Sequence, residues 1–214
     1  VEAKDVMHFV ESLYKYIFKK ALNIDIPDFS VIPYEEAKSK YNSDKPDLRK
    51  EKNDPKEFAF CWVTDFPLFS FNKEEKRWEP EHHMFSSPRK EYLETLEKDP
   101  GKVKADLYDL VLNGVELGSG SIRINDPELQ ERVMKIIGMP KEEAWKKFGF
   151  LLEAYEYGGP VHGGMGLGID RLVALMLGFS DIREVIAFPK NKAAQCPMDG
   201  SPADVSELQL KEAN

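Results

Sequence analysis

Two carboxylates that flank an Asn-Gly pair are the residues best placed to do chemistry. Asp109 and Glu116 lie in strand-like runs on either side of Asn113 and Gly114, and Asn-Gly between two such runs is a strong hairpin signal. A two-residue turn makes the carboxylates diagonal neighbours, with backbones about 7–8 Å apart. Their side chains can close that gap around magnesium, which favours one or two carboxylates together with substrate phosphates. The hairpin alone leaves a second interpretation open, in which both carboxylates are solvated on an exposed face.

An arginine further along the second strand extends this set if the strand is irregular. Arg123 follows Glu116 by seven positions, and an odd offset places two residues on opposite faces of a regular strand. A shared site therefore requires a β-bulge, which we expect within residues 118–121. Gly118 and Gly120 are expected to continue the face of Glu116 and to leave room for a ligand. The alternative is an ordinary surface arginine.

A glycine-rich strand over residues 163–169 predicts a surface without side chains. Gly164, Gly166 and Gly168 share one face by the period of two, which would give a flat floor for a planar base or a closely approaching substrate. Arg171 falls in the first turn of the helix that follows, where anions are already favoured. The spacing matches neither a GxGxxG turn that opens a βαβ unit nor a GKS or GKT phosphate loop.

The adjacent pair His82 and His83 stands out in a chain with 4 histidines. Neighbouring residues on a strand point to opposite faces, so the pair by itself is more typical of a surface loop than of a shared ligand set. No HxxxH spacing supports zinc.

The elements that must position these residues follow from periodicity and from helix start and stop signals. Antiparallel hairpins followed by helices favour an α+β fold over a doubly wound sheet. The first helix is expected to bury an apolar face that comprises Val6, Phe9, Val10, Leu13, Ile17 and Ala21. The expected elements are helices over residues 3–22, 35–40 and 92–97, strands over 58–63, 68–71, 107–112, 115–124 and 163–169, helices that begin after Asp126 and Pro140, a helix over 170–177, and a short helix after Asp204.

Composition excludes several classes of protein. The 214 residues are 42% hydrophobic and 32% charged, which is ordinary for a globular domain, and no apolar run approaches the roughly 18 residues of a membrane helix. Cys61 and Cys196 lack metal or redox spacing and are interpreted as free thiols in a reducing cytoplasm. The net charge of −8 argues against a protein that mainly grips phosphate backbones, so any contact with nucleic acid is local.

Several segments resemble class II aminoacyl-tRNA synthetases of the bacterial aspartyl type. The segment GLGIDRL, which contains Arg171, is similar to motif 3 of that class, and residues 113–123 are similar to the strand that precedes it. Further matches occur in family order and cover most of the chain: SDKPDLR (43–49), WVTDFPLF (62–69), HHMFSSP (82–88), KFGFLLEAYEYGGPVHGG (147–164) and IREVIAFPKN (182–191).

The resemblance implies an aspartate–tRNA ligase that uses ATP and Mg²⁺. It implies that Asp109 and Glu116 hold the magnesium on ATP, that Arg123 clamps the side-chain carboxylate of aspartate, and that His82 belongs to a mobile loop that closes over this substrate. Gly164 would also contact the substrate. Glu116 and Arg171 would be the catalytic residues, and Arg171 would contact the terminal phosphate of ATP. The ATP-binding residues would be Glu116, Gly166, Gly168, Ile169, Asp170 and Arg171.

The resemblance also sets expectations for the organisation of the chain. Residues 1–214 would form a single, partial catalytic domain, with a loop at 41–57 in place of the usual bacterial insert domain and a tail at 196–214. The dimer motif, the motif 2 arginine and the anticodon-binding barrel would precede Val1, so the chain alone is expected to form no adenylate. Expected partners are L-aspartate, tRNA(Asp), with tRNA(Asn) as a second candidate, and a second copy in a cytoplasmic homodimer that has no contact with membranes.

Two alternatives remain at this point. Asparaginyl and lysyl enzymes of the same class tend to carry an acidic residue after the arginine, where this chain has Ile124. A non-catalytic, synthetase-like paralogue that acts as a binding module would be expected to lack motif 2. In addition, Met84 replaces a proline often found after the paired histidines.

Overall fold

The protein folds into two compact units in the computed structural model, which describes residues 1–52, 54 and 56–213. The first unit comprises residues 1–167 and contains the sheet, and the second comprises residues 168–214. No helix in the described parts of the chain is long and apolar enough to cross a bilayer.

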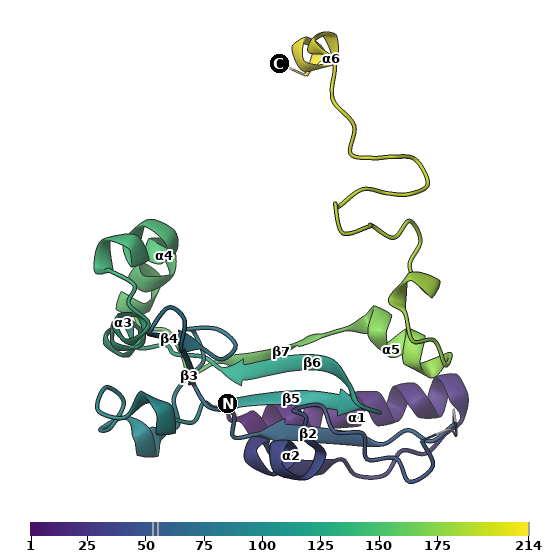
Figure 1. The fold of residues 1–214 in the computed structure, drawn as a ribbon, viewed down its shortest axis with the longest axis horizontal. Coiled ribbons are helices and arrows are strands. Elements are labelled where there is room, and N and C mark those ends of the chain that lie inside the picture. Colours follow the sequence, from purple (N-terminus) through teal and green to yellow (C-terminus); the bar gives the residue numbers. More distant parts are fainter. Residues whose placement is uncertain (53, 55, 214) are drawn as a thin grey trace. The chain divides into compact units, whose positions relative to one another are not determined.

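The sheet of the first unit has the strand order β1-β2-β5-β6-β7, and Figure 1 shows β2, β5, β6 and β7 side by side. β1 and β2 are parallel, whereas the other neighbours are antiparallel. The predicted antiparallel sheet is therefore confirmed apart from its edge strand, which sequence patterning missed. The strands are β1 (Ser30–Pro33), β2 (Phe60–Thr64), β5 (Leu107–Leu112), β6 (Val115–Ile122) and β7 (Gly163–Leu167).

Helix α1 (Ala3–Leu22) lies against one face of this sheet (Figure 1) and packs aromatic side chains onto it. Tyr14 and Phe18 contact Phe60 edge to face, at ring-centroid distances of 5.7 and 5.4 Å. The bounds of the predicted helix are confirmed, but its predicted apolar face is only partly right: Val10 is buried, whereas Phe9 is 70% exposed. The face of α1 that packs against the sheet is the one that carries Tyr14 and Phe18, because aromatic side chains bury large apolar areas.

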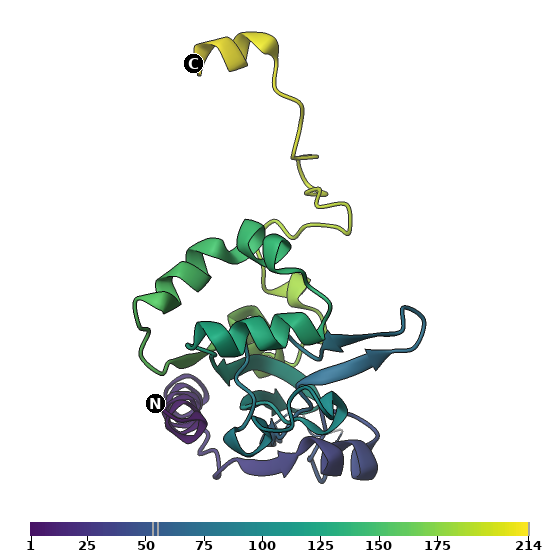
Figure 2. The same cartoon turned by 90° about the vertical axis from the view of Figure 1, so that its left-hand side faces the viewer.

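The opposite face of the sheet packs against α2 (Tyr34–Tyr41) and the segments that connect β2 to β5. A small hairpin, β3 (Phe69–Asn72) with β4 (Arg77–Pro80), projects from this region at the right of the view in Figure 2. The predicted helix over residues 92–97 was wrong. Short 3-10 turns lie on either side of it, at Lys90–Tyr92 and Pro100–Lys102. The backbone next to these turns forms hydrogen bonds with other segments: Leu68 N–H, for example, donates to Val103 O at 2.7 Å.

The β5–β6 turn confirms the predicted hairpin. Asn113 and Gly114 both have positive φ, 52° and 82°, as a type I′ turn requires. The Asn113 side chain also accepts a hydrogen bond from Ala59 N–H and donates one to Glu57 O, both at 2.9 Å. It therefore ties the turn to the start of β2.

Replacing Asn113 with alanine is expected to lower the free energy of unfolding by about 1–3 kcal/mol, because both hydrogen bonds and a residue tolerant of positive φ are lost. Urea denaturation measures this change. Asn113→Asp keeps the acceptor for Ala59 and should lose less. Equal losses in the two variants would show that the acceptor contributes nothing.

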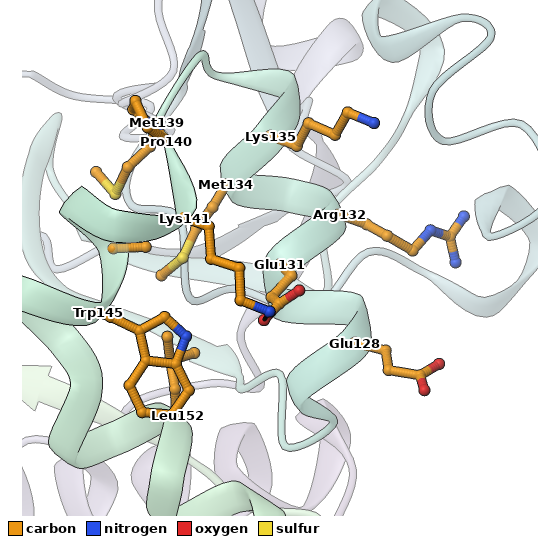
Figure 3. A pocket seen from close by; sticks show the side chains of 11 residues that line it. Glu128, Glu131, Arg132, Met134, Lys135, Met139, Pro140, Lys141, Trp145 and Leu152 are labelled. Carbon is orange, nitrogen blue, oxygen red and sulfur yellow. Dashed lines mark ion pairs between the residues drawn. The ribbon is translucent and has the colours of Figure 1, made fainter.

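Helices α3 (Pro127–Ile136) and α4 (Lys141–Glu156) form a pair beside the sheet. Asp126 caps α3 as predicted, accepting from Glu128 N–H at 2.8 Å. The two helices enclose an apolar cavity of about 510 Å³, at whose rim Lys141 and Glu131 form an ion pair of 2.9 Å (Figure 3). Phe148 of α4 packs against Phe85 at 5.1 Å between ring centroids, so the pair supports the segment that follows His82 and His83.

The second unit begins at Gly168, the N-cap residue of α5 (Ile169–Met176). The buried side chains of α5 are Leu172 and Ala174. A 3-10 turn at Ile182–Glu184 and the short helix α6 (Glu207–Glu212) follow, the latter near the position predicted after Asp204.

Candidate active site

A bulge in β6 brings Asp109, Glu116 and Arg123 to one face of the sheet. The register pairs Val111 with Glu116, as predicted, and Asp109 with Ser119, which leaves one extra residue, Leu117. The extra residue reverses the alternation of side chains beyond it. The bulge that Arg123 requires is therefore confirmed, but it lies one position before the predicted segment 118–121.

The displaced bulge corrects the expected roles of Gly118 and Gly120. They pair with Leu110 and Tyr108 and so lie on the face covered by α1, away from Glu116. A Cβ on Gly120 would clash with Gly164 O and would lie 2.6 Å from Tyr108 Cε2. These glycines allow β7 to approach β6 closely, and they do not make room for a ligand beside the carboxylates.

Asp109 is a buried carboxylate with one satisfied oxygen. Its residue is 1% exposed, and its Oδ2 lies 3.3 Å from His82 Nε2. Oδ1 is buried and has no hydrogen-bond partner among the described residues. Burial of the His82 ring opposes its charged form, but the hydrogen bond and negative charge of Asp109 prevail and raise the pKa of His82.

Glu116 is more accessible and has a lysine partner. Its side chain is 24% exposed and forms an ion pair of 2.9 Å with Lys45 of the SDKPDLR loop. This loop packs against the hairpin turn, since a Cβ on Gly114 would lie 3.4 Å from Asp47 Cβ. The loop therefore reaches the same end of the hairpin as Glu116.

Arg123 lies next to His83, rather than His82. Arg123 Nη1 and His83 Nδ1 are 3.4 Å apart. Burial and the positive charge of Arg123 lower the pKa of His83 to about 4. The paired histidines point to different parts of the site, His82 to Asp109 and His83 to Arg123.

Arg123 and His83 border a cleft of about 510 Å³ whose floor is the glycine-rich strand β7. Gly164 and Gly166 pair with Ser121 and Ser119, so they share the face of Asp109. A Cβ on Gly164 or Gly166 would meet no atom within 4 Å. The predicted floor without side chains is therefore present at Gly164 and Gly166, but β7 ends at Leu167 and Gly168, the third predicted glycine, is the N-cap of α5. The cleft is lined by His83, Phe85, Ser119, Gly120, Arg123, Leu151, Tyr155, His162, Gly163, Gly164, Met165 and Gly166.

Several of these lining residues were missed by sequence reasoning. His83 belongs to the same adjacent pair as His82, and sequence reasoning offered no basis for choosing between them. Only the fold shows that the two side chains have different partners. Tyr155 and His162, whose rings lie 6.2 Å apart, stand in the segment that resembles the family, but their types alone gave no reason to select them. Ser119 was considered only as part of the segment 118–121 that was expected to hold the bulge.

The remaining predicted residues belong to the second unit. Gly168 is the N-cap of α5, and Ile169, Asp170 and Arg171 form its first turn. The predicted position of Arg171 at the start of this helix is confirmed. The ATP-binding role of these four residues stays a prediction.

Curated proteins of similar sequence are aspartate–tRNA ligases. The chain is 58% identical over 158 residues to the aspartate–tRNA(Asp/Asn) ligase of Treponema denticola, a match that covers 74% of this chain and 27% of that protein. It is 54% identical over 159 residues to the aspartate–tRNA ligase of Clostridium tetani, again covering 74% and 27%. The chain thus spans little more than a quarter of the length of these relatives.

Solved structures share the fold at lower sequence identity. An aspartyl-tRNA synthetase from Entamoeba histolytica has a TM-score of 0.65 and 20% identity, covering 92% of this chain and 42% of that one. An asparaginyl-tRNA synthetase from Pyrococcus horikoshii has a TM-score of 0.63 and 23% identity, covering 90% and 47%. Residues 1–192 match the family model of class II tRNA synthetases (D, K and N). The chain therefore belongs to the class II tRNA synthetases of the D, K and N group.

Proposed function

We propose that this chain is part of the catalytic domain of an enzyme that activates L-aspartate with ATP and transfers it to tRNA. The observation that carries the proposal is Arg123 at the edge of a cleft with a glycine floor. No carboxylate forms an ion pair with it in the described part of the chain. A guanidinium in that position suits the side-chain carboxylate of aspartate, which it can bind through two parallel hydrogen bonds. The similarity to aspartate–tRNA ligases supports the same substrate.

The proposed first step needs alignment and no protein nucleophile. The α-carboxylate of aspartate attacks the α-phosphorus of ATP, forming aspartyl-adenylate and releasing pyrophosphate. Arg123 fixes the substrate by its other carboxylate, and the bare backbone at Gly164 and Gly166 lets the reacting groups lie close to the sheet. Positioning of this kind supplies much of the rate enhancement when the nucleophile is already ionised. A hydroxyl of the terminal ribose of tRNA then attacks the carbonyl carbon of the adenylate, which forms the aspartyl ester and releases AMP.

The residues present fit Mg²⁺ held jointly with ATP. Asp109 Oδ1 is buried without a hydrogen-bond partner among the described residues, and Glu116 lies diagonally across the same face. Two carboxylates are enough for Mg²⁺ when phosphate oxygens and waters complete its shell. When bound there, the cation would offset the negative charge of the triphosphate.

Arg171, Gly168, Ile169 and Asp170 are proposed to bind ATP, with Arg171 on the terminal phosphate. A guanidinium in the first turn of a helix combines its charge with the positive end of the helix dipole. His82 is proposed to act near aspartate. The tRNA partner, whether tRNA(Asp) alone or also tRNA(Asn), and a homodimeric state belong to the proposal for the complete protein.

Amino-acid-dependent exchange of labelled pyrophosphate into ATP tests the proposed function. The complete protein is expected to exchange with L-aspartate at a kcat/KM at least about 100-fold above that for L-asparagine, because the amide leaves the partly buried guanidinium without its anion. Exchange driven by asparagine or lysine would reassign the substrate. No exchange with any of the three would favour a non-catalytic binding module.

The glycine floor allows a matched pair of substitutions. Gly164→Ala is expected to change the free energy of unfolding by less than about 1 kcal/mol, since its Cβ meets nothing within 4 Å, and yet to raise the KM of a substrate that approaches the strand. Gly120→Ala should instead unfold at lower temperature, because its Cβ clashes with β7 and Tyr108. Thermal unfolding and exchange kinetics on both variants separate the two effects. Unchanged KM values in Gly164→Ala would show that no substrate reaches the floor.

A further inference from the structure

The neutral ring of His83 is the hydrogen-bond partner of the Arg123 guanidinium. Arg123 Nη1 lies 3.4 Å from His83 Nδ1, and the backbone N–H of Phe85 donates to the same nitrogen at 3.3 Å. Guanidinium and amide nitrogens are donors only, so Nδ1 must carry the lone pair and Nε2 the proton. Two independent donors therefore select one tautomer.

Backbone hydrogen bonds fix both partners. Ile124 N–H donates to Phe85 O at 3.0 Å, and Ser87 N–H donates to Ile122 O at 2.9 Å. These two hydrogen bonds lie on either side of an isolated antiparallel β-bridge between Ser86 and Arg123. The imidazole and the guanidinium thus come from segments that are joined on both sides of the contact, so the contact is built into the fold.

The partner of Arg123 is uncharged at neutral pH. Burial and the charge of Arg123 hold the pKa of His83 near 4, and in the described part of the chain no carboxylate forms an ion pair with Arg123. A neutral acceptor orients a guanidinium and leaves its full charge for an incoming anion. A carboxylate in the place of His83 would cancel that charge before substrate arrives.

We propose that His83 is a positioning residue that aims Arg123 into the cleft through Nδ1 and keeps its charge available for the side-chain carboxylate of the substrate. The proposal rests on the proposed function for the identity of that substrate. The pairing of His83 with Arg123 does not depend on it.

The pairing is tested without any substrate. In protein labelled with ¹⁵N-histidine, the Nδ1 resonance of His83 is expected to show an unprotonated nitrogen at neutral pH. Arg123→Leu should raise the pKa of His83 above about 4, toward its ordinary value, because the neighbouring positive charge is gone. Arg123→Lys, which keeps a charge, should raise it less. A protonated Nδ1, or a pKa that stays the same in Arg123→Leu, overturns the proposal.

The role in substrate binding is tested with three replacements of His83 in the complete protein. Asparagine keeps a neutral acceptor close to the position of Nδ1, aspartate has the same shape with a negative charge, and leucine removes the acceptor. We expect the KM for L-aspartate to rise no more than about threefold in His83→Asn and about tenfold or more in His83→Leu and His83→Asp, since a hydrogen bond to a charged group is lost or its charge is cancelled. The KM for ATP and the melting temperature should match the wild type in His83→Asn and His83→Asp.

The comparison of asparagine with aspartate at position 83 decides the outcome, because the two variants differ only in charge. Equal KM values for L-aspartate in these variants, or a parallel rise in the KM for ATP, would overturn the positioning role. If the wild type exchanges with a different amino acid and the NMR result holds, the substrate assignment fails and the pairing of His83 with Arg123 stands.

Discussion

Arg123→Leu is expected to reduce aspartate-dependent ATP–pyrophosphate exchange by about 10²–10³-fold in kcat/KM, because a buried charge pair that loses one partner typically costs 2–5 kcal/mol. Arg123 borders the cleft beside His83, 3.4 Å from its Nδ1. The variant leaves the substrate carboxylate desolvated and unpaired. The same loss should not appear in the KM for ATP, since Arg123 is proposed to contact the amino acid only.

Arg123→Lys is the matched control for charge. It keeps the positive charge but lacks the planar fork that binds both carboxylate oxygens, so we expect an intermediate loss. Circular dichroism and thermal unfolding check that both variants fold. If the kcat/KM of Arg123→Leu is within about threefold of the wild type, Arg123 does not bind the substrate, because losing even one hydrogen bond to a charged group lowers kcat/KM by more than that factor.

Asp109→Asn is expected to lower kcat for exchange by about 10²-fold or more and to raise the magnesium concentration needed for half-maximal rate, because metal neutralisation of phosphate charge contributes several kcal/mol to the transition state. Asp109 is 1% exposed and its Oδ1 has no hydrogen-bond partner among the described residues. The amide keeps the shape of the side chain and removes the charge. A magnesium titration of the exchange rate measures both quantities.

Asp106→Asn provides the control for loss of a neighbouring carboxylate. Asp106 precedes β5, is partly buried, and has a pKa raised by that burial, but it does not share the face of Asp109. Its variant should keep the magnesium dependence of the wild type. If Asp109→Asn and Asp106→Asn behave alike, the effect reflects loss of charge in general, and the proposed magnesium site is wrong.

The hairpin that carries the carboxylates could be predicted because its determinants are local. Asn113 and Gly114 favour the two positive φ values of the turn, and the turn fixes the pairing of Val111 with Glu116. The bulge could be inferred only as a requirement of Arg123. Its position at Leu117 depends on how β7 packs against Gly118 and Gly120, which is a tertiary contact that the sequence of the strand does not specify.

The division of roles between His82 and His83 was likewise beyond sequence reasoning. Adjacent residues point apart, but which of them faces Arg123 depends on the register between Ser86 and Arg123 and on the packing of Phe85 against α4. The face of α1 was misjudged for a similar reason. Apolar periodicity marks a broad stripe, and the rings of Tyr14 and Phe18 determine which part of it is buried against β2.

A crystal structure of the complete protein with a non-hydrolysable aspartyl-adenylate analogue tests the proposed site most directly. We expect both oxygens of the aspartyl side-chain carboxylate at about 2.7–2.9 Å from the guanidinium nitrogens of Arg123, with the analogue lying over Gly164 and Gly166 and His83 Nδ1 still facing Arg123. Binding of that carboxylate by any other residue, or of the analogue outside this cleft, would contradict the proposed site.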